Sequence, residues 1–100
     1  IQAISCVYLF HELPRTIREK VLKEFFRVLE PGGILVLADS IQISDSPDYI
    51  KIMENFYKSF HEPFYCDYIK EDIHSKIEKI GFNHVKSSSF FMTKVWSAIK

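Results

Sequence analysis

Apolar residues are arranged in two short continuous runs, and between these runs they recur at helical spacing. Segments 4–10 and 34–38 are almost wholly apolar and rich in β-branched and aromatic side chains, which predicts two buried strands. Between them, residues 16–29 place apolar side chains at every third or fourth position and charged ones opposite, so they predict an amphipathic helix. Thr16 and Glu19 have capping-box spacing, so we expect them to cap its first turn.

The helix and the second strand are separated by a turn sequence. Pro31-Gly32-Gly33 cannot continue a helix, so we expect the helix to end at Glu30. Two strands joined by one helix form a β-α-β unit, in which the strands are parallel. Because both strands are continuous apolar runs, we also expect them to be covered on both faces.

The rest of the chain predicts two further helices, a loop between them and two final strands. These elements span residues 48–60, 61–68, 68–80, 82–89 and 91–99. Gly81 follows the last helix and is expected to be its C-cap. Only a short turn separates the final strands, so we expect them to pair as an antiparallel hairpin. The sequence thus predicts an α/β fold of parallel strands, a C-terminal hairpin and about three helices.

Composition narrows the classes of function. Apolar residues make up 47% of the 100-residue chain, which is enough for a packed core. The 13 basic and 13 acidic residues balance, so no charge excess predicts binding to nucleic acid or to a membrane surface. No apolar run approaches the roughly 20 residues of a membrane span. Cys6 and Cys66 form no disulfide framework or zinc motif, which favours a cytoplasmic protein with reduced thiols.

One longer motif resembles the signature of a known enzyme family. Residues 24–37 read Glu-Phe-Phe-Arg-Val-Leu-Glu-Pro-Gly-Gly-Ile-Leu-Val-Leu. This closely resembles the E-x-x-R-V-L-x-P-G-G-x-L-x-x run of class I S-adenosylmethionine-dependent methyltransferases, which spans the helix after strand four, the turn and strand five. Residues 7–14 resemble the end of that family's strand four. Gly81-Phe82 and the two terminal strands match its final helix and hairpin.

The resemblance covers the whole chain but only the C-terminal half of the family's domain. It implies half of a Rossmann-like sheet, with strands 4-5-7-6 of the family order 3-2-1-4-5-7-6. Ligands of such sheets bind at the carboxyl ends of the strands where the winding reverses, so the missing half would hold most of the cofactor site. The chain has 3 glycines and none in a G-x-G pattern, so the family's glycine-rich loop is absent. We therefore expect a fragment that is inactive by itself.

The resemblance implies that the end of the first strand faces the cofactor, S-adenosylmethionine. Leu9, Phe10 and His11 are expected to contact its methionine part. His11 is also the candidate catalytic base, because a histidine imidazole titrates near neutral pH. The alternative is that His11 and Glu12 cap the following helix and face solvent. Methyl transfer depends mainly on alignment of the reactants, so a strong base is not obligatory.

Polar residues at the strand ends and in the aromatic loop are candidates for binding a small-molecule acceptor. They are Glu12, Asp39, Ser40, His61, Glu62 and Tyr65. Asp39 and Ser40 end the second strand on the same side as His11, although they could instead bond the backbone of the next loop. The loop residues combine polar tips with aromatic bodies, which suits a lid over a small organic molecule, or else packing against the core.

Metal binding, a non-catalytic interaction module and a dehydrogenase are the alternatives to the methyltransferase prediction. The candidate metal ligands His11, Glu12, His61, Glu62 and Cys66 lack the spacing of a metal motif, so we expect no metal site. An unpaired strand edge favours a non-catalytic interaction module that forms a homodimer. A nicotinamide-dependent dehydrogenase would share the doubly wound sheet, but the Pro-Gly-Gly turn and the terminal hairpin argue against it.

Overall fold

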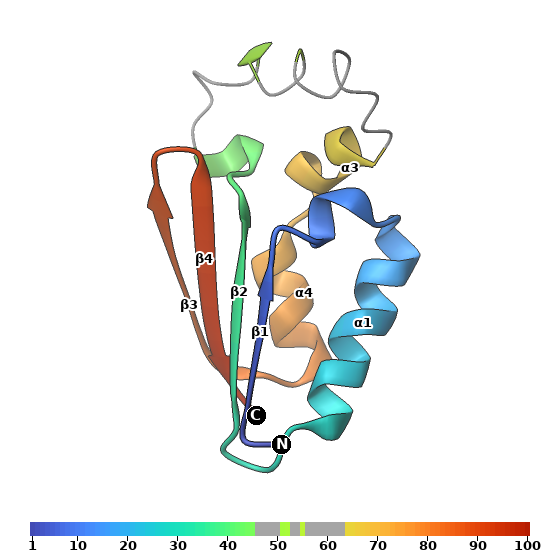
Figure 1. The fold of residues 1–100 in the computed structure, drawn as a ribbon, viewed down its shortest axis with the longest axis vertical. Coiled ribbons are helices and arrows are strands. Elements are labelled where there is room, and N and C mark those ends of the chain that lie inside the picture. The colour runs from blue at the N-terminus through green and yellow to red at the C-terminus, as the bar shows by residue number, and fades with distance from the viewer. Residues whose placement is uncertain (46–50, 53–54, 56–63) are drawn as a thin grey trace.

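The computed structural model describes residues 1–45, 51–52, 55 and 64–100. They form one four-stranded sheet in the order β1-β2-β4-β3, with helices packed against it (Figure 1). The strands are β1 (Ala3–Val7), β2 (Ile34–Ser40), β3 (Asn83–Phe90) and β4 (Thr93–Ile99). The helices are α1 (Arg15–Val28), α3 (Tyr65–Lys70) and α4 (Ile73–Ile80), with 3₁₀ turns at Phe10–Glu12 and Ile43–Asp45.

The predicted β-α-β unit is confirmed. β1 and β2 pair in parallel, with Ala3 opposite Ile34 and Val7 opposite Ala38. The turn between α1 and β2 requires glycine, because a Cβ at Gly33 would lie 2.8 Å from the carbonyl oxygen of Glu30. The carboxyl ends of β1 and β2 consequently lie together at the upper end of the sheet in Figure 1.

The C-terminal hairpin is also confirmed. β3 and β4 pair antiparallel, and β4 pairs antiparallel with β2, so the sheet is mixed. The register places Thr93 opposite Ser40, which brings the start of β4 to the carboxyl end of β2. The turn of the hairpin therefore lies at the same end of the sheet as the loops that follow β1 and β2 (Figure 1).

The core lies between the sheet and the helices. It joins Leu22 of α1 and Ile73 and Ile77 of α4 to Leu37 and Trp96 of the sheet, each with at most 1% of its surface exposed. The apolar spacing along the predicted helices is what brings these side chains to one layer. Gly81 caps α4 with φ 127°, as predicted, because this conformation is strained for any other residue.

The prediction that β1 and β2 are covered on both faces is wrong for the described residues. Alternate side chains of β2 are buried and exposed, and Val7, Ile34 and Val36 expose 62%, 48% and 37% of their surfaces. The physical reason is that α1 and α4 pack together on the same side of the sheet, and no described element covers the other side (Figure 1). We call this uncovered side the open face.

The capping box predicted for α1 is also wrong. The helix begins one residue earlier, at Arg15, and Pro14 is its N-cap with no side-chain hydrogen bond. The Pro14 carbonyl accepts hydrogen bonds from the amides of Ile17 and Arg18. At the other end, the last helical residue is Val28, so the helix stops earlier than expected.

Three further boundaries differ from the predictions. The first strand ends at Val7, because residues 10–12 turn into a 3₁₀ helix. The helix expected over 68–80 is divided into α3 and α4, and α3 includes Tyr65, which the sequence predicts to lie in the loop. Asp72 makes the break by accepting a hydrogen bond from the Ser75 amide as the N-cap of α4. The helix expected over 48–60 falls mostly outside the described residues.

The longest helix in the described part of the chain is α1, with 14 residues. None of the helices in the described ranges is both long and apolar enough to cross a bilayer.

Candidate functional site

The candidate site is built where β1 and β2 end. Tyr8, Leu9, Phe10 and His11 follow β1, and Asp39 and Ser40 are the last residues of β2. The parallel pairing continues one step beyond β1, because the Tyr8 amide donates to the Ala38 carbonyl at 2.8 Å. The polar residues expected from the sequence at these two strand ends are therefore brought together.

Asp39 organises the chain that follows β1. Its side chain is fully buried, and its Oδ2 accepts hydrogen bonds from the backbone amides of Phe10 at 2.8 Å and His11 at 3.3 Å. Its Oδ1 accepts a further bond from the Ser40 amide at 2.7 Å. A buried carboxylate is stable only when hydrogen-bonded in this way, so Asp39 holds the 3₁₀ turn against the end of β2.

Asp39 also orients the His11 ring. His11 Nδ1 lies 2.8 Å from Asp39 Oδ1, and the side chain of His11 is only 14% exposed. A carboxylate accepts only, so Nδ1 is the donor in this bond, and the neutral tautomer with this geometry has Nε2 as its proton acceptor. Glu12 Oε1 lies 3.8 Å from Nε2 with a mostly exposed side chain. The arrangement can accept a proton at Nε2 and stabilise the resulting charge through Asp39.

A mainly apolar cavity of about 320 Å³ lies beside this histidine. It is lined by Tyr8, His11, Ser40, Ile52, Tyr65, Met92 and Thr93. The rings of Tyr8 and Tyr65 both meet the His11 ring edge to face, with centroids 6.5 and 6.0 Å away. Among the described residues that line it, the titratable groups are one imidazole and two phenols, so this part of the lining suits a small, uncharged organic molecule.

Hydrogen bonds hold the two tyrosines of this cavity. The Tyr65 hydroxyl and Ser40 Oγ are 2.7 Å apart, and the Tyr8 hydroxyl is hydrogen-bonded to Thr93 Oγ1. Burial raises the pKa of Tyr65, the hydrogen bond to Ser40 opposes that shift, and the charge of Asp39 adds to it. Tyr65 therefore stays a neutral hydroxyl at physiological pH.

The structure distributes the sequence-predicted residues unevenly around this cavity. His11, Ser40 and Tyr65 line it, whereas Asp39 lies behind His11. The Phe10 side chain is fully buried in the core, and Leu9 is 39% exposed beside it. His61 and Glu62 lie outside the described residues.

Four lining residues were not foreseen from the sequence. They are Tyr8, Ile52, Met92 and Thr93. Met92 and Thr93 come from the hairpin at the far end of the chain, and only the pairing of β4 with β2 brings them here. Tyr8 directly precedes the predicted cofactor segment, and this position is the feature of the sequence that could have indicated its place at the cavity.

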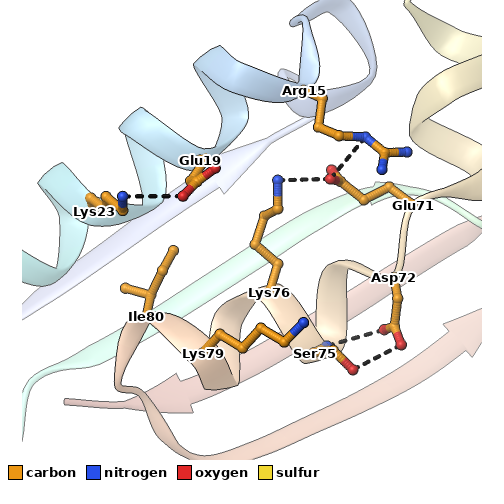
Figure 2. Close-up of a pocket in the computed structure, with 9 residues that line it drawn as sticks. All are labelled: Arg15, Glu19, Lys23, Glu71, Asp72, Ser75, Lys76, Lys79 and Ile80. Carbon is orange, nitrogen blue, oxygen red and sulfur yellow. Dashed lines mark hydrogen bonds and ion pairs between the residues drawn. The ribbon is translucent and has the colours of Figure 1, made fainter.

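A larger cavity, of about 710 Å³, lies between α1 and α4 and is shown in Figure 2. Most of its charged side chains are already paired: Lys76 Nζ lies 2.7 Å from Glu71 Oε2, and Lys23 Nζ lies 3.1 Å from Glu19 Oε1. Arg15 also reaches Glu71, at 3.1 Å. A ligand here would have to displace ion pairs, so the strand-end cavity is the stronger candidate despite its smaller volume.

The described residues include histidine, cysteine and carboxylate side chains of the types that ligate metals. Within the described ranges, no three histidine, cysteine, aspartate or glutamate side chains are grouped to hold a metal ion. Burial raises the pKa of the Cys6 thiol, which favours its neutral form within the core.

Several solved structures that share this fold carry the name of a methyltransferase. Human N-acetylserotonin methyltransferase, in complex with SAM, superposes with a TM-score of 0.75 at 12% identity over 99% of this chain and 29% of its own. An O-methyltransferase family protein from Burkholderia thailandensis gives 0.73 at 11% identity, over 99% and 30% of the two chains. PigF, solved with SAH, gives 0.67 at 11% identity over 99% and 30%. The sequence matches no protein-family model and no curated protein.

The fold of this chain is therefore that of the C-terminal region of a methyltransferase. At identities this low, the likeness establishes a shared fold and not a shared reaction. The chain spans about 30% of the length of these structures. This fold bears out the fold class that the sequence resemblance implied.

Proposed function

We propose that this chain is the acceptor-binding part of an S-adenosylmethionine-dependent methyltransferase that methylates a hydroxyl group of a small molecule. The observation that carries the proposal is the His11–Asp39 pair at the carboxyl ends of two parallel strands, beside a mainly apolar cavity. Ligands of open α/β sheets bind at this end of the strands. The methyltransferase fold supports the same assignment.

The residues of this chain fit one end of the cofactor. Leu9 is 39% exposed at the end of β1 and would pack against the methionine part, next to His11. Phe10 would support this surface from below, because its side chain is buried. The chain's glycines are Gly32, Gly33 and Gly81, and none belongs to a G-x-G loop, so other residues of the full-length protein would hold the nucleoside.

The chemistry of the acceptor follows from the His11–Asp39 pair. When bound, S-adenosylmethionine supplies an electrophilic methyl group that leaves sulfur for the acceptor oxygen. His11 Nε2 takes the proton of the acceptor hydroxyl, so that the oxygen attacks with a full lone pair. Asp39 keeps the ring in the required tautomer and stabilises the imidazolium that forms. The walls of the cavity align the acceptor, which is the main requirement of a displacement reaction.

The other acceptor contacts are assigned from the same geometry. Ser40 and Tyr65, joined by their 2.7 Å hydrogen bond, offer a neutral polar contact opposite His11. Glu12 would lie at the mouth of the cavity, near His11 Nε2. His61 and Glu62 stay candidates for the lid predicted from the sequence.

The proposal is tested with the full-length protein that contains this chain. We expect it to transfer the labelled methyl group of S-adenosylmethionine to the hydroxyl of small phenols and alcohols, giving labelled methyl ethers by mass spectrometry. The isolated chain should give no product, because it lacks the glycine-rich loop. Transfer only to nitrogen or carbon, or to no small molecule, would contradict the proposal.

A second candidate function is self-association of the isolated chain. β1 is an edge strand, and no described strand pairs with its outer side. The open face beside it exposes Val7, Ile34 and Val36. An unpaired edge next to an apolar face favours a homodimer. Sedimentation equilibrium of the isolated chain should then show a dimer. At about 100 μM, even a weak specific dimer with a Kd near 10 μM would form, so a monomer at that concentration would contradict this function.

A further inference from the structure

Tyr8 has an unusual backbone conformation for its position. It follows directly after β1 with φ 53°, in the left-handed region that side chains other than glycine rarely adopt. Its amide still completes the pairing of β1 with β2 by donating to Ala38. The turn in the backbone therefore redirects the Tyr8 side chain without breaking the sheet.

The redirected side chain reaches across the sheet. Its hydroxyl is hydrogen-bonded to Thr93 Oγ1 on β4, although β2 lies between β1 and β4 in the strand order. Thr93 is the register partner of Ser40, so the Tyr8 ring crosses the carboxyl end of β2. We call the hydrogen-bonded Tyr8 and Thr93 the tyrosine bridge.

Packing does not account for the tyrosine bridge. Tyr8 is 48% exposed and lies outside the core cluster. A left-handed non-glycine residue is strained by about 1–3 kcal/mol, and an exposed hydrogen bond returns little of that. Strain that packing does not require is typical of functional sites. Both ends of the bridge line the acceptor cavity, and the Tyr8 ring meets His11 edge to face.

We propose that the tyrosine bridge is a specificity-determining element that limits the width of the acceptor cavity. This inference rests on the proposed acceptor site at His11. The Tyr8 ring forms one wall of the roughly 320 Å³ space, and the Thr93 hydrogen bond holds that wall in place. Acceptors carrying one ring fit against His11, and those with a bulky extension meet the bridge.

The test compares two probes, 4-methylphenol and 4-phenylphenol, on the isolated chain. Their dissociation constants are measured from the NMR shifts of the assigned His11 imidazole, and thermal melting checks that each variant folds. Tyr8→Ala should favour binding of 4-phenylphenol over 4-methylphenol by about tenfold relative to the wild type, which is the scale of a pocket contact of this size. Tyr8→Phe and Thr93→Val keep the aromatic ring but remove its hydrogen bond, so each should change the ratio of the two constants in the same direction by about threefold. Thr93→Ser keeps the hydroxyl and should leave the ratio unchanged.

The outcomes distinguish failure of the tyrosine bridge from failure of the proposed acceptor site. Tyr8→Phe, Thr93→Val and the double variant should show the same ratio, because all three remove one hydrogen bond. An unchanged ratio in Tyr8→Ala, with both phenols still bound beside His11, overturns the bridge and leaves the acceptor site standing. If Tyr8→Ala does not fold, the Tyr8→Phe and Thr93→Val ratios decide. If neither phenol moves the His11 signals in any variant, the acceptor site and the bridge both fail.

Discussion

Changing His11 to glutamine in the full-length protein should lower kcat for methyl transfer by about 10²–10⁴-fold. Glutamine keeps a polar side chain of similar length, but it has no nitrogen that takes up a proton near neutral pH. The effect should fall on kcat more than on the KM for S-adenosylmethionine, because the proton moves only during the reaction. Initial rates with labelled cofactor and a saturating phenol measure both quantities.

Asp39 and His74 provide the matched comparisons for His11. Asp39→Asn replaces the carboxylate with an amide that can hold the wrong tautomer, so it should also lower kcat strongly and shift the pH–rate profile. The double variant should be little worse than either single one, because the two residues act as a unit. His74→Gln removes a partly exposed histidine of α4 and should leave kcat unchanged. Full activity in His11→Gln would contradict a base role for His11 and would mean that alignment of the two reactants is sufficient for catalysis.

Changing Arg18 to alanine should lower the free energy of unfolding by about 3 kcal/mol, the lower end of the range for breaking a buried ion pair. Arg18 is fully buried and donates to Glu71 at 2.9 Å and to Asp67 and the Leu13 carbonyl. Its removal leaves the nearly buried Glu71 short of one partner. Arg15 and Lys76 still contact Glu71, which is why we expect the lower end of that range. Urea unfolding followed by circular dichroism measures the loss.

Arg27→Ala is the control for Arg18. Arg27 is 69% exposed on the same helix and pairs with the exposed Glu24, so its loss should change stability far less than the loss of Arg18. Equal losses in the two variants would contradict the role of the buried network, because the change from arginine to alanine affects helix propensity alike at both positions.

Acid unfolding examines the same network through Asp67. Burial raises the pKa of Asp67, but hydrogen bonds from Arg15 and Arg18 outweigh burial and leave the pKa below its usual value. Its contribution to stability is therefore complete above the unfolded-state pKa of about 4 and is lost as the pH falls through the folded-state pKa. Arg18→Ala should weaken this dependence, so the variant should lose less additional stability than the wild type below about pH 4.

The parts of this fold that depend on local patterns can be predicted from the residues alone. Continuous apolar runs at 4–10 and 34–38, with an amphipathic helix between them, leave few arrangements other than a right-handed parallel unit. The Pro-Gly-Gly turn and Gly81 mark helix ends because their backbone requirements are intrinsic to those residues. The placement of His11 and Asp39 at neighbouring strand ends follows from the parallel pairing alone.

What those residues do depends on packing between elements that are far apart along the chain. Asp39 was expected at the acceptor, yet it is buried behind His11, because three backbone amides and one imidazole converge on its carboxylate. The open face depends on which elements pack nearby, which no run of apolar residues reveals. Tyr8 and Thr93 are 85 positions apart and meet only through the order of the strands. Contacts between distant residues arise from the packing of whole elements, so they cannot be predicted from the pattern of neighbouring residues along the chain.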